Sequence, residues 1–296
     1  MALGGNALLP RGVAPEAGVQ VSHVEQVAPA LASLARDHEL ILTHGNGPQV
    51  GMLALESDAD AQLERPYPFD ALVAETQGMI GYWLQRSIAS AGLDDPIVTV
   101  VTQTVVDPTD PAFRSPTKFV GATYDEATAR ALARQRGWTV GRDGDRWRRT
   151  VPSPAPAAVV ELDAIRRLVD DGVTVVCAGG GGCPVAVSGD RLVGVEAVVD
   201  KDLVASLLAV ELDADLLVMV TDVAGILEGY GTPEARLIED VAAAELARLL
   251  LAAGSMGPKA DAACRFAERT GRTAVIGALD DVAELVAGTS GTRVHP

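Results

Sequence analysis

The chain has 296 residues, of which 48% are hydrophobic and 30 are glycine, and its formal net charge is −16. This length and hydrophobic fraction predict a globular α/β protein and exclude a disordered chain. The negative charge disfavours binding to nucleic acids or anionic membranes, because such surfaces need a basic field. No charged-then-apolar leader opens the sequence, and no apolar run reaches the ~18 residues of a membrane span, so we expect a soluble cytoplasmic protein.

The three cysteines, Cys177, Cys183 and Cys264, show no spacing typical of metal ligands. Their odd number excludes complete pairing within one chain. We therefore expect reduced thiols, as is usual for a cytoplasmic protein. Aromatic residues make up only 4% of the chain, so the core must consist mainly of aliphatic side chains, which suits buried parallel strands.

Helical and strand patterns alternate along most of the chain. Only three residues precede the first glycines, so either the first strand is very short or the chain begins late relative to its relatives. The first helix is expected to be capped by Ser22, with Glu25 three residues later. The expected helices span residues 22–36, 50–57, 70–91, 159–171, 200–211, 239–252 and 257–270. The expected later strands span residues 39–43, 96–106, 173–178, 215–221 and 273–276, the last being the final strand. This alternation predicts a mostly parallel sheet covered by helices on both faces.

Residues 107–156 interrupt this alternation. Prolines cluster there, charged residues become frequent, and two of the three tryptophans lie in this stretch. Strand-like pieces at 138–140 and 146–149 flank an Asp143-Gly144 turn, which is typical of a hairpin. We interpret the segment as a small lobe inserted between helix–strand units, and not as a separately folding domain.

Glycine-rich loops follow several of the predicted strands. They are Gly4-Gly5-Asn6, Gly45-Asn46-Gly47 and residues 179–182, and a further strand ends at Thr221-Asp222. Ligands of open α/β sheets bind at the carboxyl ends of the strands, and glycine lets backbone N–H groups approach an anion closely. Each loop alone could be an ordinary turn, and none matches a Walker or dinucleotide motif. Three such loops in one sheet nevertheless favour a phosphate-binding site.

Only three of the 24 basic residues are lysines: Lys118, Lys201 and Lys259. In a chain that otherwise uses arginine, a retained lysine indicates a role for a compact ammonium group, although a leftover surface lysine is the alternative. Lysines can neutralise the charge of a phosphoryl group during its transfer. Asp202, beside Lys201, could hold two ammonium groups in place or help to hold a metal. The alternative for Asp202 is a solvated carboxylate at a helix start.

These blocks, in this order, resemble the carbamate kinases of the amino-acid-kinase superfamily over nearly the whole chain. The matching blocks are residues 2–8, 43–51, 74–81, 116–118, 148–154, 178–182, 196–202, 221–223 and 254–259. The most specific are His-Gly-Asn-Gly-Pro-Gln-Val-Gly at 44–51 and Glu-Ala-Val-Val-Asp-Lys-Asp at 196–202.

The resemblance implies a three-layer αβα sandwich formed by a single domain, residues 1–296, and assembled as a homodimer. It implies reversible phosphoryl transfer between ATP and carbamate, giving ADP and carbamoyl phosphate, with ATP synthesis as the expected physiological direction in arginine metabolism. The half up to about residue 158, including the lobe at 107–156, is expected to bind carbamate. The half from about 159 is expected to bind the nucleotide, with Mg²⁺ held mainly by the ATP phosphates and not by a set of protein ligands.

The same resemblance implies a role for individual residues. The expected catalytic residues are Lys118, Lys201, Asp202 and Lys259. The expected carbamate and phosphoryl cradle consists of Gly4, Gly5, Asn6, Gly45, Asn46 and Gly47. The expected nucleotide-binding residues are Gly180, Gly181, Lys201, Thr221, Asp222, Ser255, Met256 and Lys259. Because carbamate is itself a carboxylate-like nucleophile, no strong general base is needed. We therefore expect His44 to be structural and not catalytic.

The sequence departs from the family pattern at the first strand, which lacks a few of the usual apolar residues, and at three further places. Residues 119–124 replace the Pro-Ile-Gly-Pro-Phe-Tyr-like run that usually follows Pro-Thr-Lys. Cys183 stands where isoleucine is usual, and it either packs in the core or makes the loop sensitive to oxidation. Ile226-Leu227 stands where a tyrosine is usual, so contacts with adenine are expected to differ. Two alternative functions stay open: a superfamily kinase that acts on another small acid, and a nucleotide-binding regulatory homologue that has lost phosphoryl transfer.

Overall fold

A computed structural model describes residues 1–5, 9, 13–249 and 256–296. Within these ranges the middle layer is an eight-stranded sheet of order β15-β17-β16-β12-β1-β2-β9-β3. Its strands are β1 (Ala2–Leu3), β2 (Ile41–His44), β3 (Ile97–Thr99), β9 (Thr174–Val176), β12 (Leu217–Thr221), β15 (Asp240–Ala242), β16 (Ala274–Ala278) and β17 (Thr292–His295). Neighbouring strands are parallel except for β16 and β17, so the predicted mostly parallel sheet is confirmed.

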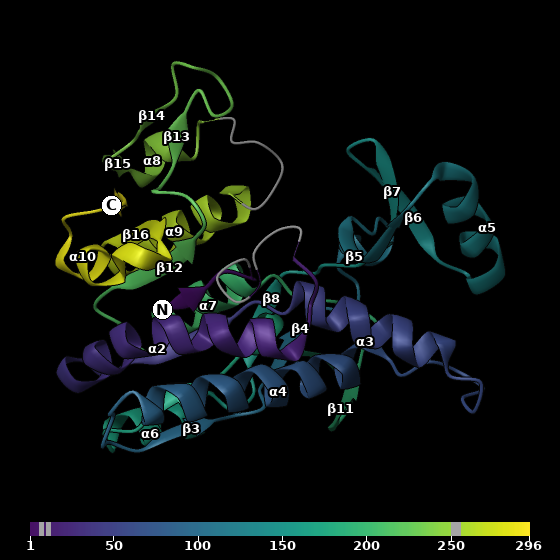
Figure 1. Cartoon of the computed structure of the whole chain (residues 1–296), viewed down its shortest axis with the longest axis horizontal. Coiled ribbons are helices and arrows are strands. Elements are labelled where there is room, and N and C mark those ends of the chain that lie inside the picture. Colours follow the sequence, from purple (N-terminus) through teal and green to yellow (C-terminus); the bar gives the residue numbers. More distant parts are fainter. Residues whose placement is uncertain (6–8, 10–12, 250–255) are drawn as a thin grey trace.

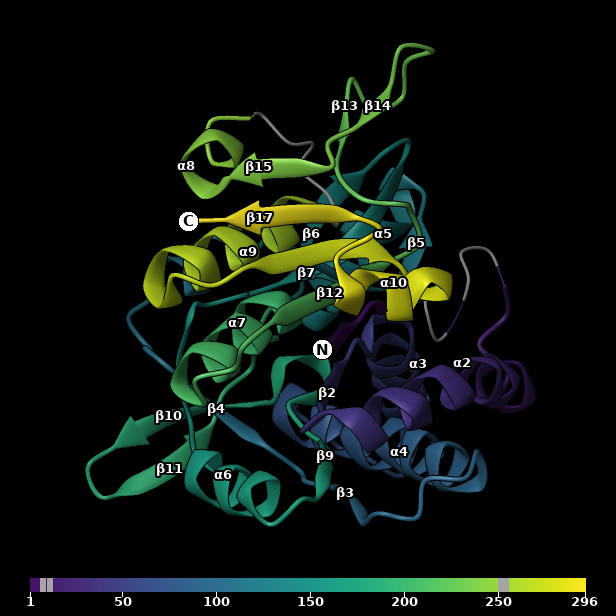
Figure 2. The same cartoon turned by 90° about the vertical axis from the view of Figure 1, so that its left-hand side faces the viewer.

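Helices cover both faces of this sheet, as Figure 2 shows. On one face lie α2 (Ala17–Asp37), α4 (Phe69–Ser90) and α10 (Val282–Ala287), and on the other α6 (Leu162–Asp170), α7 (Lys201–Glu211) and α9 (Met256–Thr270). Side chains of β12 alternate between the two layers: Val218 and Val220 pack with the first group of helices, Leu217 and Met219 with the second. This period of two is what a strand buried on both faces requires. The predicted three-layer αβα sandwich is confirmed.

The lobe is inserted between two strands that pair with each other. A second sheet has the order β11-β10-β4-β8, with β4 at Gln103–Val106, β8 at Pro156–Val159, β10 at Cys183–Ser188 and β11 at Arg191–Gly194. Because β4 and β8 are antiparallel neighbours, the segment between them leaves and returns at one place. That segment forms β5 (Lys118–Tyr124), α5 (Glu126–Arg136), β6 (Thr139–Asp143) and β7 (Arg146–Val151). Figure 1 shows it standing away from the remainder of the chain, as the sequence predicts.

The remaining described elements are short or connect the layers. They are α3 (Gly47–Ala59), α8 (Ala243–Leu246), the hairpin β13 (Leu227–Glu228) with β14 (Arg236–Leu237), and single turns of 3₁₀ helix at Pro111–Phe113, Gly179–Gly181 and Leu279–Asp281. Among the described residues, no helix combines the length and the apolar character needed to span a membrane.

The first helix begins five residues before the predicted start, so Ser22 is not its cap. It begins at Ala17 after Glu16, which makes no side-chain capping bond. The early turn is held by tertiary contacts instead: Gln20 Nε2 donates to the Pro15 carbonyl, and Gln49 Nε2 donates to Gln20 Oε1. Local capping patterns do not report such contacts, which explains the error.

The predicted strand at 96–106 is two strands in two sheets. The break falls at Thr102, whose backbone N–H donates to Gln77 Oε1 and whose carbonyl accepts from Gln77 Nε2. A side chain from α4 thus takes the place of a neighbouring strand. The predicted helix at 159–171 starts only at Leu162, because residues 156–159 pair with β4 as strand β8.

The carboxyl-terminal region also differs from the prediction. The predicted helix at 239–252 contains β15 and only one helical turn, α8, and its last three residues lie outside the described ranges. Strand 273–276 is not the final strand, since β17 follows and pairs antiparallel with it. The hairpin β10–β11 was not predicted either. These short strands form through pairing with distant segments, so their local sequence carries little signal.

Candidate active site

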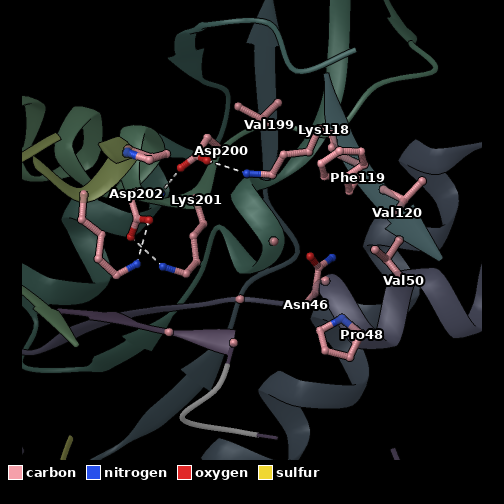
Figure 3. Close-up of a pocket in the computed structure, with 18 of the residues that line it drawn as sticks. Asn46, Pro48, Val50, Lys118, Phe119, Val120, Val199, Asp200, Lys201 and Asp202 are labelled. Carbon is pink, nitrogen blue, oxygen red and sulfur yellow. Dashed lines mark hydrogen bonds and ion pairs between the residues drawn. The ribbon is translucent and has the colours of Figure 1, made fainter. Parts of the chain in front are cut away.

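A cavity of about 300 Å³ lies where the glycine loops at the carboxyl ends of β1 and β2 meet the Gly179–Gly182 turn after β9. The end of β12 and the first turns of α7 and α9 complete its floor, and β5 of the lobe forms one wall. Eleven of the predicted site residues line it: Gly4, Gly5, Gly45, Asn46, Gly47, Lys118, Gly180, Lys201, Asp202, Thr221 and Lys259. Figure 3 shows lysine and aspartate side chains on one side of this cavity, opposite Asn46 and Pro48.

Asp202 holds two lysines from different helices at the cavity. Its Oδ1 lies 2.6 Å from Lys201 Nζ, and its Oδ2 lies 3.0 Å from Lys259 Nζ. All three side chains are largely buried, with exposed fractions of 7%, 12% and 5% in that order. The structure therefore supports the prediction that Asp202 holds two ammonium groups and excludes the solvated helix-start carboxylate.

The electrostatics of this cluster depend on burial and on charge pairing. Burial lowers the pKa of Lys201, and the neighbouring Asp202 carboxylate opposes that effect. For Asp202 burial alone would raise the pKa, but Lys201 and Lys259 together bring it below its ordinary value. The cluster is therefore a carboxylate between two ammonium groups, and it leaves one net positive charge in a chain of charge −16.

Lys118 reaches the same cavity from the lobe. Its Nζ lies 2.7 Å from Asp200 Oδ2, and its side chain is 43% exposed. The other carboxylate oxygen of Asp200 accepts from the backbone N–H of Asp202, so Asp200 caps α7. Asp200 was not predicted as a site residue. The signal available in the sequence was its place just before a helix, where aspartate is a preferred cap.

Close backbone contacts explain two of the glycines. A Cβ on Gly45 would lie 2.8 Å from the backbone nitrogen of Gly5, so the first two loops touch each other. Gly180 has φ +63°, and a Cβ there would lie 2.2 Å from Asn46 Nδ2. Asn46 is in turn fixed by a hydrogen bond from its Nδ2 to Thr76 Oγ1. The three loops therefore form one continuous floor with bare backbone exposed to the cavity.

Three predicted nucleotide-binding residues do not line the cavity. Gly181 lies behind it, and its carbonyl accepts from Thr104 Oγ1. Asp222 accepts a hydrogen bond from Thr221 Oγ1 at the rim, and Met256 packs against the core around α9. Two further predicted residues, Asn6 and Ser255, lie outside the described ranges.

An apolar wall was missed by the sequence analysis. The lining side chains that were not predicted are mainly apolar: Pro48, Val50, Phe119, Val120, Val198, Val199 and Pro258, together with Asp200. They come from α3, the lobe, the segment before α7 and the first turn of α9. In the sequence, apolar residues that line a cavity look the same as residues of the hydrophobic core, so no local pattern identifies them.

His44 and Cys183 are packed behind the site. Burial lowers the pKa of His44 to about 4, and its Nδ1 lies 3.1 Å from the Gly45 carbonyl, which fits a neutral ring that donates there. The predicted structural role of His44 agrees with this burial. Cys183 is buried and accepts a hydrogen bond from Gln77 Nε2, and burial raises its pKa to about 11. Cys183 is therefore a packing residue, not a reactive thiolate.

Comparison with known proteins identifies the family. The model of the family described as "Amino acid kinase family" matches residues 1–278. The chain belongs to the amino acid kinase family. Within it, a carbamate kinase of Rhizobium meliloti (strain 1021) is 47% identical over 298 residues, covering 99% of this chain and 92% of that protein. A carbamate kinase of Escherichia coli (strain K12) is 47% identical over 294 residues, covering 99% and 98%.

Solved structures share the fold over nearly the whole chain. Carbamate kinase from Giardia lamblia bound to AMP-PNP superposes with a TM-score of 0.90 at 38% identity, covering 99% of this chain and 96% of that one. An isopentenyl phosphate kinase of T. acidophilum has a TM-score of 0.54 at 13% identity, which indicates a shared fold alone. As a member of this family, the chain is a kinase, that is, a phosphotransferase that uses ATP or ADP.

Proposed function

We propose that the chain is a carbamate kinase, which transfers the γ-phosphoryl group of ATP reversibly to carbamate, giving ADP and carbamoyl phosphate. The observation that carries this proposal is the Lys201–Asp202–Lys259 cluster beside the joined glycine loops. It places two ammonium groups and bare backbone at one cavity. Relatives from bacteria and archaea that carry the name carbamate kinase, at 44–47% identity over the full chain, support the choice of carbamate.

The geometry supports catalysis by positioning and charge neutralisation. The carboxylate of carbamate is itself the nucleophile, so the site needs no base to remove a proton. Phosphoryl transfer spreads negative charge over the equatorial oxygens, and the ammonium groups of Lys201 and Lys259 can neutralise it. In the reverse direction the same groups would stabilise the phosphoryl group as it leaves carbamoyl phosphate for ADP.

We further propose how the cavity is divided between the substrates. Gly4, Gly5, Gly45 and Gly47, with Asn46 and Lys118, would hold carbamate and the transferring phosphoryl group, as the resemblance to carbamate kinases implies. Gly180, Thr221 and Lys259 would border the nucleotide. Mg²⁺ would be held mainly by the ATP phosphates, since both carboxylates of the cavity are already engaged by lysines. Bound to the ATP phosphates, Mg²⁺ would neutralise part of their negative charge.

The direct test is ATP formation from ADP and carbamoyl phosphate with Mg²⁺ present. We expect turnover by the wild-type chain, and a kcat lower by about 100-fold or more in Lys201→Ala and in Lys259→Ala, because each loses a contact to transition-state charge. Arg265→Ala is the matched control, since Arg265 lies on the same helix as Lys259 but pairs with Asp261 on the exposed surface. Near-wild-type rates in both lysine variants would reject the assigned roles.

A panel of acyl phosphates separates the alternatives. Turnover of another acyl phosphate but not of carbamoyl phosphate would identify a kinase for a different small acid. Nucleotide binding without any transfer would identify the regulatory homologue.

We propose ATP synthesis as the physiological direction, in a cytoplasmic enzyme of arginine metabolism. The free state of all three cysteines supports a reducing compartment.

We also propose a homodimer. Strand β3 ends the central sheet, so one of its edges has no neighbouring strand within the described residues. Tyr82 and Val101 have exposed fractions of 56% and 49%, and both line one surface hollow together with Thr99 of β3. A second copy of the chain would cover them. Sedimentation equilibrium should give twice the mass of one chain for the wild type, and Tyr82→Asp should shift it toward one.

A further inference from the structure

A row of stacked side chains fastens the lobe to the remainder of the chain, and it lies outside the active-site cavity. The guanidinium carbon of Arg149, on β7, lies 4.9 Å from the centre of the Phe69 ring and 4.8 Å from that of Trp138. The guanidinium carbon of Arg136, at the end of α5, lies 5.0 Å from the same Trp138 ring. Phe69 is the first residue of α4, whereas the other three residues belong to the lobe.

Ion pairs close both ends of this row on the body of the protein. Arg149 Nη2 lies 3.3 Å from Glu196 Oε1, and Arg136 pairs with Asp58 of α3. The second oxygen of Glu196 accepts the backbone N–H of Phe69 at 3.0 Å, which ties Glu196 to the start of α4. The row therefore runs from Glu196 and Phe69 through the lobe and back to Asp58.

Each ion pair of the row has one partner that is largely buried. The side chains of Arg149 and Asp58 are 21% and 13% exposed, whereas their partners Glu196 and Arg136 are 53% and 31% exposed. Burial lowers the pKa of Arg149, and the nearby Glu196 carboxylate offsets that effect. Cation–π contacts contribute ~0.5–1 kcal/mol when exposed and ~2 kcal/mol when desolvated. Arginine suits the place better than lysine, because its planar group stacks on rings and pairs with a carboxylate at the same time.

The body anchors lie on segments that also line the active-site cavity. Glu196 is followed by Val198, Val199 and Asp200 of the cavity wall, and Asp58 lies on α3, whose first turn contributes Gly47 and Pro48. On the lobe side, β7 pairs with β5, placing Val151 opposite Lys118. A shift of the row would thus move Lys118 relative to Asp200, its partner across the cavity.

We propose that Arg149 and Trp138 are positioning residues, which hold the lobe at the angle that keeps Lys118 over the carbamate side of the cavity. This inference rests on the proposed function. Lys201, Asp202, Lys259 and the nucleotide side belong to the body, whereas Lys118 belongs to the lobe, so loosening the row displaces only Lys118 and the lobe wall. The row therefore determines the affinity for the small acid, or its phosphate, and leaves the affinity for ADP unchanged.

Steady-state kinetics of three variants test this inference. We expect Arg149→Lys and Trp138→Leu to raise the KM for carbamoyl phosphate by about 10-fold while the KM for ADP stays within about 2-fold. Trp138→Phe keeps a stacking ring and should restore most of the affinity. Trp147→Leu is the matched control, because Trp147 stacks on Arg130 of the lobe's own helix at 4.9 Å, and it should leave both values unchanged.

A second measurement does not depend on the proposed reaction. In a chain carrying Trp83→Phe and Trp147→Phe, Trp138 is the only tryptophan, and its fluorescence reports its contact with solvent. Adding Glu196→Gln should increase quenching by acrylamide, because the Arg149 end of the row loses its ion pair with the body. Absence of carbamoyl phosphate turnover by the wild type, together with increased quenching, would reject the proposed function but support the fastening of the lobe.

Two results would overturn the inference. One is an unchanged KM for carbamoyl phosphate in both Arg149→Lys and Trp138→Leu, with unchanged quenching in the Glu196→Gln chain. The other is an equal rise of both KM values together with a lower melting temperature, because that combination indicates a general loss of structure and not a displaced lobe.

Discussion

Asp202 controls the charge of the candidate site, because each of its two oxygens pairs with a different lysine. Without it, two buried ammonium groups would face each other in a medium of low polarity. Removing one member of a buried charge cluster leaves the others uncompensated, which is costly. The charge state of Lys201 therefore depends on a neighbour that does not itself need to touch a substrate.

Asp202→Asn should shift the alkaline limb of the kcat profile toward lower pH. Burial lowers the pKa of Lys201 and Asp202 counteracts it, so removing the carboxylate lowers that pKa further. Lysine must be protonated to act, and activity is lost as pH rises through its pKa. We expect a shift of about one pH unit or more, as is typical for loss of one opposite charge. An unchanged alkaline limb in the variant would contradict this linkage.

His44 should make the protein less stable in mild acid. Its pKa is about 4 in the folded chain and 6.5 when unfolded, so the unfolded chain takes up the proton first. The stabilising contribution of the neutral ring is complete above pH 6.5 and is lost as pH falls toward 4. That loss is on the order of 3 kcal/mol. Urea unfolding at several pH values should show that the free energy of unfolding depends less steeply on pH in His44→Asn than in the wild type. Parallel curves would show that His44 does not cause the loss of stability in acid.

At the scale of elements, Asp200 joins helix α7 to the lobe. One carboxylate oxygen caps α7 and the other accepts from Lys118 across the cavity. The cap also fixes the first turn of α7, from which Lys201 and Asp202 extend. Formation of this helix and placement of the lobe lysine are therefore coupled through one side chain.

Two substitutions separate these roles of Asp200. Asp200→Ala should lower the free energy of unfolding by about 1 kcal/mol, the usual cost of losing a cap, whereas Asp200→Asn should keep most of the stability because asparagine caps well. Both should raise the KM for carbamoyl phosphate, since both lose the ion pair with Lys118. Denaturant unfolding and steady-state kinetics check the two expectations. A wild-type KM in Asp200→Asn would show that the pair is dispensable.

At the scale of the whole molecule, aliphatic side chains fill the core on both faces of the sheet, and two thiols lie on the face covered by α6, α7 and α9. Cys177 packs between the sheet and helices α6 and α7, and Cys264 lies among the alanines around α9. Burial raises the pKa of Cys177 to about 12 and that of Cys264 to about 11. The fold therefore keeps its thiols protonated and shielded.

Thiol titration should count the cysteines only after unfolding. With an aromatic disulfide reagent at pH 8, we expect almost no reaction of the native chain and three equivalents in guanidinium, because all three thiols are free and buried. The thiol of Cys183 is the informative one, since its position in the glycine turn would allow rapid reaction if it were exposed. Rapid modification of one native thiol would contradict the packing role of Cys183, and Cys183→Ala would identify it.

Much of the architecture could be predicted from the sequence. The apolar run at residues 215–221 and the helical pattern at 200–211 are local properties, and the structure has strand β12 and helix α7 there as expected. Short strands that depend on distant partners, such as β8 and β17, could not be predicted in this way. Gln77 is an example. It lies on helix α4, about 25 residues before Thr102, and its side chain makes both backbone hydrogen bonds of Thr102 at the point where the predicted strand 96–106 is interrupted.

The residues of the candidate site likewise fall into those that could be predicted from the sequence and those that could not. Lysine scarcity and glycine loops marked Lys118, Lys201, Lys259 and the cavity floor, because those residue types are unusual where they stand. Only the tertiary structure decided which of the other residues face the cavity: it left Gly181 and Met256 outside, and it brought in Asp200 and an apolar wall. The physical reason is that chemical type belongs to the residue itself, whereas facing a ligand depends on how separate elements pack together.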